Sequence, residues 1–341
     1  MLYPISRAAL FKLEPETAHA VTLAAVARMG SVPPIRAALA ACFCLPEAEP
    51  VEAFGLRFPN RVGLAAGYDK DGEGWRGLAS LGFGHIEVGT VTPQPQPGNP
   101  KPRVFRLVDR RSVINRMGFP GRGAAYVAEQ LRRPRKPGLV LGVNLGKQKS
   151  TALEDAAHDY EELMEVFAPL ADYLAVNISS PNTPGLRKLQ ERSFLGALLG
   201  RLAAKQTELA DNYGARIPIL VKLAPDLDPD QLRTAVDVIV EAGLDGIIAT
   251  NTTIARDTVE GHPIAPQEGG LSGAALTDMS TGIIAAIAGH LDGALPIIGV
   301  GGIMSPEDAR DKLDAGATLV QIYTGMIYEG PGLVKRILRA L

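Results

Sequence analysis

The sequence predicts an α/β protein: a (β/α)8 barrel of the TIM type, preceded by a small helical extension. Three observations support this fold class. Short apolar runs recur from residue 53 onward, helix-like segments separate them, and the runs number eight. Alternating strands and helices imply parallel strands, and eight such units point to a closed barrel. A doubly wound sheet is the alternative, but its glycine-rich dinucleotide fingerprint is missing after the first run.

The expected strands are short and apolar, as suits strands that are buried on both faces. In chain order they are Arg61–Gly67, His85–Val91, Leu139–Leu145, Tyr173–Ser179, Pro218–Ala224, Gly246–Thr252, Pro296–Ile303 and Leu319–Gly325. The segments between them include expected helices at Asp155–Ala168, Phe194–Ala210, Pro229–Ala242 and Pro306–Ala315. Two connections, Thr92–Pro120 and Thr253–Met279, exceed usual loop lengths, so we expect them to cover the mouth of the barrel.

The first fifty residues follow a different pattern. We expect three short helices, at 4–12, from Glu14 to about Gly30, and at 35–42. From Ala18 to Ala27 the second helix has no charge other than His19 when protonated, so it must be buried or face lipid. Packing on the barrel and lying on a membrane surface both remain open. Residues 46–52 resemble a linker, so the expected organisation is a helical segment over 1–45 and a barrel over 46–341.

Composition excludes several functional classes. The chain has 341 residues, 46% of them hydrophobic and 21% charged, with a net charge of −2, which argues against a nucleic-acid partner. Cys42 and Cys44 are too close for a mutual disulfide and have no partner cluster for zinc, so we expect buried thiols and no metal site. No stretch approaches the ~20 apolar residues of a transmembrane helix. Residues 1–7 lack the features of a signal peptide.

Nearly every expected strand ends in polar residues or glycine, at the end of a barrel where active sites lie. These ends are Ala66–Lys70, Gly89–Thr90, Asn144, Asn177, Lys222, Thr250–Thr252, Gly301–Gly302 and Tyr323–Gly325. The stretch Asn177–Gly185 is the most informative, because two prolines make it a stiff loop that carries amides and hydroxyls. Amides both donate and accept, so they suit a planar ligand rich in C=O and N–H groups. A polar turn that only caps a strand is the alternative.

Two further patterns indicate chemistry at these ends. Gly299–Gly302, followed by a helix from Pro306, offers backbone N–H groups for a phosphate, with Tyr323–Gly325 as the other half. Lys222 lies inside an otherwise apolar strand and should face a cavity. It would act there either as an electrostatic stabiliser or as a Schiff-base nucleophile.

Taken together, the motifs resemble the dihydroorotate dehydrogenases over essentially the whole chain. The matching segments are Gly63–Asp71, Glu87–Val91, Pro102–Leu107, Asn115–Phe119, Asn177–Arg187, Val221–Pro225, Asn251–Thr253, Gly269–Gly273, Gly299–Gly302 and Gln321–Gly325. The resemblance is to the membrane-associated class 2 branch, because Ser180 stands where class 1 enzymes carry cysteine, and because class 1 enzymes lack the N-terminal helices.

This resemblance implies FMN at the barrel mouth, oxidation of dihydroorotate to orotate in pyrimidine synthesis, and a membrane quinone as electron acceptor. Ser180 would take the C5 proton with help from Thr183 and Phe119, and the C6 hydride would go to flavin N5. Lys70 would lie between substrate and flavin, and Lys222 would stabilise the reduced flavin.

The resemblance also implies three sets of binding residues. The cofactor set is Ala66, Gly67, Tyr68, Asp69, Lys70, Thr90, Asn144, Asn177, Lys222, Thr250, Gly273, Gly302, Tyr323 and Thr324. The substrate set is Lys70, Asn115, Arg116, Met117, Gly118, Phe119, Asn177, Asn182, Asn251 and Thr252. The quinone set is His19 and Arg106.

By the same resemblance, residues 1–45 would hold a monomer at the cytoplasmic side of the cell (inner) membrane as a peripheral protein. Three other functions remain open. They are a class 1-like enzyme with a soluble acceptor, a Schiff-base lyase built on Lys222, and a membrane-docked binding protein without catalysis.

Overall fold

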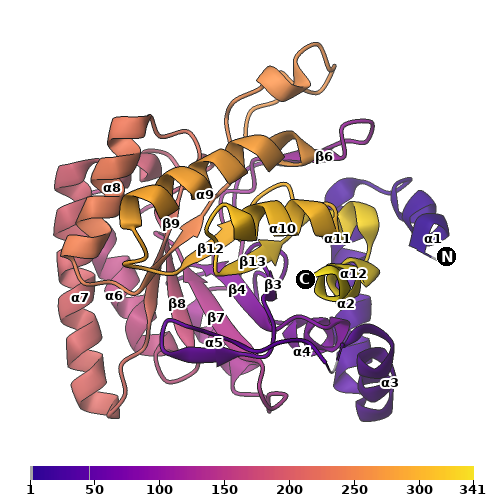
Figure 1. Ribbon diagram of the computed structural model, residues 1–341, viewed down its shortest axis with the longest axis horizontal. Helices are drawn as coiled ribbons and strands as arrows, with labels where there is room; N and C mark the ends of the chain where they lie inside the picture. The colour runs from indigo at the N-terminus through magenta and orange to yellow at the C-terminus, as the bar shows by residue number, and fades with distance from the viewer. Residues whose placement is uncertain (1–2, 46) are drawn as a thin grey trace.

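The computed structural model describes residues 3–45 and 47–341, and its centre is a closed barrel of eight parallel strands (Figure 1). In the order in which they pair around the barrel, these strands are β10 (Gly246–Ala249), β12 (Ile297–Val300), β13 (Leu319–Ile322), β3 (Val62–Leu64), β4 (His85–Val91), β7 (Val140–Leu145), β8 (Tyr173–Asn177) and β9 (Ile219–Leu223). Each of the eight expected runs contains one of them, so the predicted fold class is confirmed. Several strands end earlier than expected; β10, for example, ends at Ala249, although the Thr250 and Asn251 nitrogens still donate to the carbonyls of Val300 and Leu223 on the neighbouring strands.

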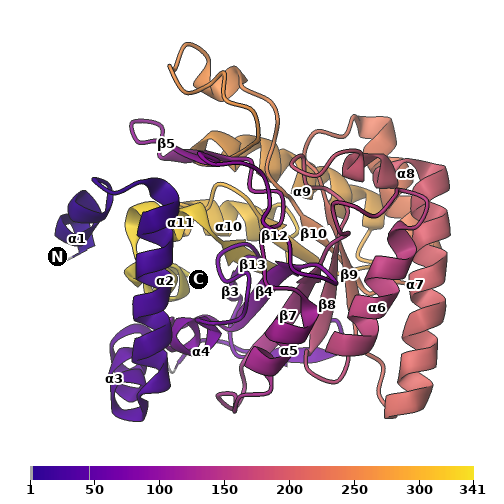
Figure 2. The ribbon, with the colours of Figure 1, turned by 180° about the vertical axis from the view of Figure 1, so that it is seen from behind.

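Helices surround the barrel on its outer side (Figures 1 and 2). They are α4 (Trp75–Leu78), α5 (Ala124–Leu131), α6 (Ala156–Phe167), α7 (Arg192–Tyr213), α8 (Pro229–Glu241), α9 (Thr277–Leu291), α10 (Pro306–Asp314), α11 (Thr324–Glu329) and α12 (Gly332–Ala340). Short 3-10 turns lie at Ala79–Leu81, Leu186–Gln190, Asp257–Val259 and Ala274–Leu276. Helix starts follow local chemistry: Asp228 and Gln231 form a capping box at α8, and Ser305 caps α10.

The N-terminal end of the barrel is closed by a hairpin of β1 (Val51–Ala53) and β2 (Leu56–Phe58). Phe54 and Phe58 pack with interior residues such as Tyr173. The segment 46–52, expected to be a linker, therefore ends in the first strand of this hairpin. With this end filled by side chains, a ligand must enter from the opposite end of the barrel.

The opposite end carries a small antiparallel sheet with the order β11-β6-β5. Strands β5 (Val104–Leu107) and β6 (Ser112–Asn115) come from the first long connection, and β11 (Gly270–Gly273) comes from the second. The two connections thus pair with each other above the barrel, as Figure 2 shows.

Three helices precede the barrel: α1 (Tyr3–Leu10), α2 (Pro15–Ser31) and α3 (Pro33–Phe43). Helix α2 packs closely on α4 at Gly30, where an added Cβ would lie 2.4 Å from the Gly77 nitrogen. Helix α1 contacts the last part of the chain, because the Tyr3 hydroxyl donates to the Ile327 carbonyl at 2.7 Å. Arg7 donates to the Tyr328 carbonyl at 2.6 Å.

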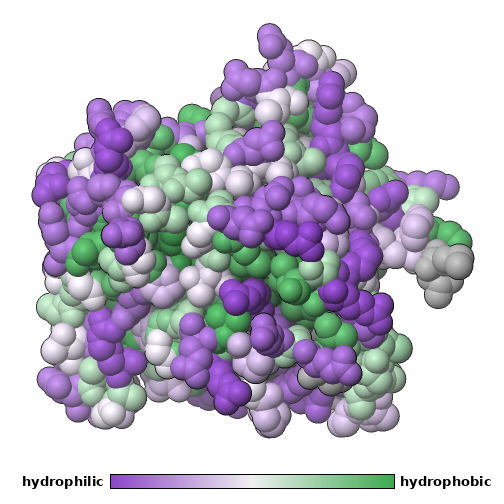
Figure 3. All heavy atoms as spheres, viewed as in Figure 1, coloured by the Kyte–Doolittle hydropathy of each residue, from purple (hydrophilic) through white to green (hydrophobic). Residues whose placement is uncertain are grey.

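The surface mixes polar and apolar residues, with pale green apolar residues at the lower right of Figure 3, where α3 lies in Figure 1. Among the described residues, one helical stretch, Ala274–Leu291, is long and apolar enough by composition to cross a membrane. This corrects the expectation that no stretch approaches that length. The stretch contains α9, which packs against α8, α10 and β12 and so belongs to the helical layer of the barrel.

Candidate active site

A cavity of about 550 Å³ opens at the C-terminal ends of the barrel strands and continues between the N-terminal helices. Its inner part is lined by strand-end residues such as Lys70, Lys222 and Asn251. Its outer part is lined largely by apolar residues of α1, α2 and α3, including Ala18 and Val26. One continuous space therefore joins the barrel mouth to the helical extension.

Most of the site residues expected from the sequence line this cavity. They are His19, Ala66, Gly67, Tyr68, Lys70, Thr90, Arg106, Asn115, Met117, Gly118, Phe119, Asn177, Ser180, Asn182, Lys222, Thr250, Asn251, Thr252, Gly273, Gly302, Tyr323 and Thr324. Four expected residues, Asp69, Asn144, Arg116 and Thr183, do not line it. Asp69 accepts from the Glu73 and Gly74 nitrogens at 2.9 Å each and so holds the turn before α4.

Arg116 and Asn144, two others of these four residues, also have hydrogen-bond partners away from the cavity. Arg116 donates to Gln267 at 2.9 Å and to the Pro102 carbonyl at 3.0 Å, which braces the β5–β6–β11 sheet. Asn144 is fully buried directly beneath the wall, where it joins two hydrogen-bond networks.

The first network is a chain of amides. The Asn177 side chain donates to the Asn144 oxygen at 3.2 Å and to the Thr90 hydroxyl at 3.0 Å. The Asn251 side chain donates to the Asn177 oxygen at 3.2 Å and to the Ser179 hydroxyl at 3.0 Å. The Asn177 oxygen also accepts from the Ser179 nitrogen at 3.3 Å, so both ends of this amide are engaged within the protein. The Asn251 oxygen accepts from the Thr252 nitrogen at 2.8 Å and keeps a lone pair for a further donor. Such a surface suits ligand N–H groups.

The second network is centred on Glu87, a fully buried carboxylate inside the barrel. It accepts from Asn144 at 2.8 Å, from the Tyr173 hydroxyl at 3.1 Å and from Gln321 at 2.9 Å. Lys222 lies near it; burial lowers the pKa of Lys222, and the Glu87 charge opposes that shift. A carboxylate beneath the cavity thus supports a buried cation in the cavity wall.

Ser180 lies in the loop after β8 and is 5% exposed. Its hydroxyl accepts from the Asn182 nitrogen at 3.2 Å. Thr183 is also buried, and in the part of the chain that the structure describes no hydrogen bond joins the two hydroxyls. Phe119, which has φ of 51°, lines the cavity together with Ser180. A proton relay from Ser180 through Thr183 therefore stays a prediction.

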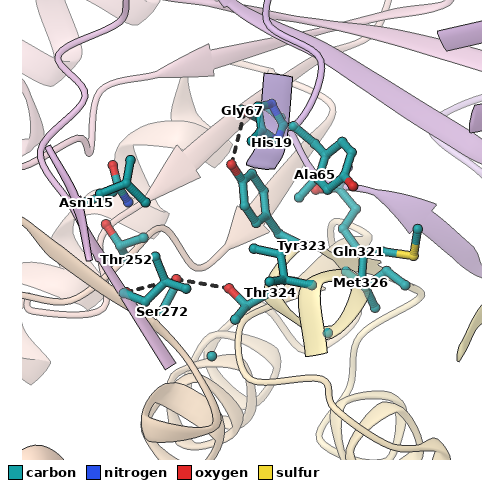
Figure 4. Close-up of a pocket in the computed structure, with 18 of the residues that line it drawn as sticks. His19, Ala65, Gly67, Asn115, Thr252, Ser272, Gln321, Tyr323, Thr324 and Met326 are labelled. Carbon is teal, nitrogen blue, oxygen red and sulfur yellow. Dashed lines mark hydrogen bonds between the residues drawn. The ribbon is translucent and has the colours of Figure 1, made fainter. Parts of the chain in front are cut away.

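Lys70 and three aromatic side chains form the junction between the two parts of the cavity. The Lys70 ammonium donates to the Gly67 carbonyl at 2.6 Å, and burial lowers its pKa to about 8. The Tyr323 hydroxyl donates to the same carbonyl at 3.2 Å, as Figure 4 shows. The Tyr68 ring makes edge contacts with Tyr323, at a centroid distance of 5.5 Å, and with His19 at 5.0 Å. Burial, followed by the Lys70 charge, lowers the pKa of His19 to about 4, so the imidazole is neutral at pH 7.

Arg106, which the resemblance assigns to the quinone site, has partners at the end of α1. Its guanidinium lies 4.6 Å from the Phe11 ring centroid and donates to the Leu10 carbonyl at 3.5 Å and to the Leu13 carbonyl. Arg106 therefore lines the cavity and also ties the α1–α2 connection to strand β5.

The turn after β12 and the start of α11 form another corner of the cavity. Gly301 and Gly302 have φ of 123° and 72°, conformations that favour glycine. Thr324 lines the same cavity and shares a hydrogen bond of 3.0 Å with Ser272 (Figure 4). Because glycines leave the backbone N–H groups accessible, this corner of the cavity suits a phosphate group.

Several lining or supporting residues were not expected from the sequence. Glu87 and Gln321 are polar residues within apolar strands, the same signal that identified Lys222, and could have been found by it. Ala18, Thr22 and Met29 of α2 carry no such signal, because small and apolar residues on a helix are equally typical of ordinary packing.

Comparison with known proteins gives consistent results. The family model described as dihydroorotate dehydrogenase matches residues 50–341. A protein of Aromatoleum aromaticum named dihydroorotate dehydrogenase (quinone) is 50% identical over 340 residues, covering 100% of this chain and 95% of that protein. A protein of the same name from Marinomonas sp. is 50% identical over 337 residues, covering 98% of this chain and 95% of its own length.

Solved structures agree with these sequences. The crystal structure of DHODH from Eimeria tenella in complex with ferulenol has a TM-score of 0.87 at 37% identity, covering 96% of this chain and 90% of that chain. The ligand-free structure from the same organism has a TM-score of 0.87 at 38% identity, with coverage of 96% and 93%.

Proposed function

The chain belongs to the dihydroorotate dehydrogenase family, and we propose that it oxidises dihydroorotate to orotate through bound FMN, with a quinone as acceptor, in pyrimidine biosynthesis. The family expected from the sequence motifs is thereby confirmed. The observation that carries the proposal is the single cavity, because one end presents amides and lysines while the other is bordered by the N-terminal helices. A polar reactant can therefore approach the cofactor from one end of the cavity, and an apolar reactant from the other.

The residues present fit FMN as the flavin. Glycines at 67, 273, 301 and 302 line the cavity, and each has positive φ, so backbone can approach a ligand closely. In the described part of the chain, the buried Gln321 side-chain oxygen has no hydrogen-bond partner, although Gln321 lines the cavity (Figure 4). A ligand donor would satisfy it. When bound, FMN supplies a two-electron acceptor.

The protein's part in the first half-reaction is to orient the substrate and to remove a proton. The Asn251 oxygen presents an acceptor to a ring N–H group, with Asn177 holding the Asn251 amide in place, and Lys70 supplies a positive charge for the carboxylate. The Ser180 hydroxyl would take the C5 proton while it passes its own proton on through the predicted Thr183 relay. The electron pair of the C5–H bond would form the C5=C6 double bond, and the C6 hydrogen would leave as hydride with the two electrons of its own bond. The Phe119 ring keeps bulk water from this step.

Lys222 has an electrostatic function. It is buried, 5% exposed, and lies near the Glu87 carboxylate. A fixed cation at this position stabilises negative charge on a reduced ring system above it, and it needs no reorganisation when the charge develops.

The N-terminal segment would serve the quinone and the membrane. Its helices line the outer cavity, and Ile5, Val21 and Ile35 are 71%, 52% and 43% exposed. Exposed aliphatic residues on short helices suit the surface of a bilayer. The enzyme would accordingly be a peripheral protein on the cytoplasmic side of the cell (inner) membrane, and a monomer. His19 and Arg106 would face the quinone head group.

The test is the visible spectrum of the purified protein, recorded anaerobically before and after dihydroorotate and again after a soluble quinone. We expect flavin absorbance that dihydroorotate bleaches and quinone restores. Bleaching without recovery would reject the quinone assignment. A colourless protein that takes up no added FMN would reject the flavin chemistry altogether.

A further inference from the structure

Lys312, on α10, is a buried cation with no part in the mechanism described above. It is fully buried, and its ammonium donates to the Thr277 carbonyl at 2.7 Å and to the Thr281 hydroxyl at 2.5 Å. Within residues 3–45 and 47–341 no ion pair joins this lysine to a carboxylate. Burying a charge without a close counter-charge is costly, so the arrangement calls for a nearby anion.

The acids around Lys312 act only from a distance. Burial lowers the pKa of Lys312 to about 8, and the charges of Asp308, Asp278 and Asp311 oppose the shift. The ammonium is therefore largely protonated at pH 7. Asp308 itself accepts from the Met304 nitrogen at 2.8 Å, and Asp278 and Asp311 are exposed. The protein thus keeps a charge in its interior that its own carboxylates only partly offset.

Contacts connect Lys312 to the glycine turn at the cavity. Thr277, whose carbonyl holds the ammonium, donates its hydroxyl to the Gly302 carbonyl at 2.8 Å. A Cβ added at Gly302 would lie 2.3 Å from the Thr277 hydroxyl oxygen, so the turn and the start of α9 are in direct contact. A Cβ added at Gly299 would lie 3.3 Å from the Lys312 Cβ.

The other side of this turn borders the cavity. Gly301, Gly302 and Thr324 line it, in the corner whose exposed backbone suits a phosphate. The order from the protein interior outward is therefore Lys312, Thr277, the Gly301–Gly302 turn and the cavity. An anion bound in this corner would lie on the opposite side of one turn from the buried ammonium, in surroundings of low dielectric where charges interact strongly.

We propose that Lys312 is a positioning residue and a buried counter-charge for the FMN phosphate, acting from behind the Gly301–Gly302 turn through Thr277. This inference rests on the proposed function, because it requires a phosphorylated flavin in the cavity. A counter-charge role for Lys312 differs in one respect from a purely structural role, in which Lys312 would only hold α9 and α10 together. A counter-charge raises the affinity only for ligands that carry the phosphate, whereas a purely structural contact affects the affinity for every ligand of the cavity equally.

Comparison of FMN with riboflavin, which has the same ring and side chain without the phosphate, separates the two roles. The flavin is removed from the wild-type protein and from Lys312→Met, and each apoprotein is titrated with both flavins while quenching of flavin fluorescence is recorded. We expect Lys312→Met to weaken FMN binding by about tenfold or more at low salt, the size expected for a charge pair at an effective dielectric of about 20. Riboflavin affinity should be unchanged.

Two further variants make the outcome decisive. Lys312→Gln keeps a donor for the Thr277 carbonyl but removes the charge, so it should show the same selective loss and also serves if the methionine variant fails to fold. Lys205→Met, which removes an ion-paired lysine on the outer helix α7, should bind both flavins as the wild type does. Equal losses for FMN and riboflavin, or wild-type FMN binding by Lys312→Gln, would overturn the inference. If the wild-type apoprotein binds neither flavin, the proposed function fails instead.

Discussion

The two ends of the cavity are built in different ways. At the barrel end, Asn144, Asn177 and Asn251 are joined by hydrogen bonds of 3.2 Å, and the buried Glu87 anchors the chain of amides from below. At the helical end, the wall consists largely of apolar side chains such as Ala18 and Val26, with the neutral His19 among them. Hydrogen bonds determine which ligands the barrel end can bind, whereas shape alone largely determines which ligands the helical end can bind.

This difference indicates how selective each end can be. Amides fixed by internal hydrogen bonds cannot turn to suit a different ligand, and a ligand without a donor for the buried Gln321 oxygen would leave that atom unpaired. An apolar channel discriminates weakly between ligands, since each methylene contributes only about 0.8 kcal/mol. The enzyme should therefore be strict toward its reductant and tolerant toward the ring and tail of its quinone.

The largest expected effect that is confined to the barrel end of the cavity is that of Ser180→Ala. Loss of the proton acceptor should slow flavin reduction by dihydroorotate by about 10²- to 10⁴-fold, the usual contribution of a general base. Flavin should remain bound, because Ser180 is assigned to proton transfer. Stopped-flow absorbance gives the rate, and Ser193→Ala, at an exposed position of α7, is the control. Loss of flavin together with activity would contradict the assignment.

Filling the helical end should affect only the second half-reaction. Ala18 is 9% exposed and lines the cavity, so Ala18→Leu places a larger side chain in the channel. Overpacking costs about 1–3 kcal/mol, so reoxidation by quinone should slow by about tenfold while reduction by dihydroorotate is unaffected. Ala24→Leu, at an exposed position of the same helix, is the matched control. An equal effect on both half-reactions would show that the ends are not independent.

The pH dependence of ligand binding should report Lys70 at the junction. Burial lowers its pKa to about 8, with Glu16, Asp71 and Asp69 raising it and Arg103 lowering it. Because the protonated form attracts a carboxylate, orotate should bind tightly below pH 8 and several-fold more weakly as pH rises above it. Titration of the oxidised flavin spectrum with orotate measures this without catalysis. Persistence of the same inflection in Lys70→Met would assign it to another group.

The smallest effect is expected at the outer surface of the helical extension. Ile5 and Val21 are exposed, so the double change to serine should leave the free energy of unfolding nearly unchanged. Binding to anionic phospholipid vesicles should fall by about fivefold or more, if each side chain buries part of its ~1.5–3 kcal/mol in the bilayer. Val240→Ser, at an exposed position of α8, is the control for sedimentation assays. Unchanged vesicle binding would remove these residues from the membrane surface.

The barrel was predictable because its pattern is repetitive. Eight apolar runs with polar ends are sufficient to place the strands, their direction and the edge at which Asn177, Lys222 and Asn251 meet. The pairing of β6 with β11 was not predictable in detail, because it joins residues from two distant loops, such as Ile114 and Leu271, that have no common local signal. Only the presence of a cover could be inferred, from loop length.

The candidate site was likewise predictable at its surface and less so beneath it. Strand-end positions identify Lys70 and Asn177, but the positions of Asp69 and Asn144 behind the wall depend on the side-chain directions that the barrel imposes. The hydrogen bonds of Glu87 depend on three strands converging inside the barrel, which spacing along the sequence cannot give. Lys312 was missed because a charged residue on a charged helix is ordinarily solvated.

The contact between α1 and the end of the chain has a consequence for the order of assembly. Tyr3 donates to the carbonyls of Met326 and Ile327, more than 320 residues away in sequence, and its ring blocks a Cβ at Gly330. During synthesis the first helix is made long before its partner exists. It must therefore wait, with its apolar side chains uncovered, until the last turns of the barrel leave the ribosome. The wall of the outer cavity is thus among the first parts to be translated and the last to be completed.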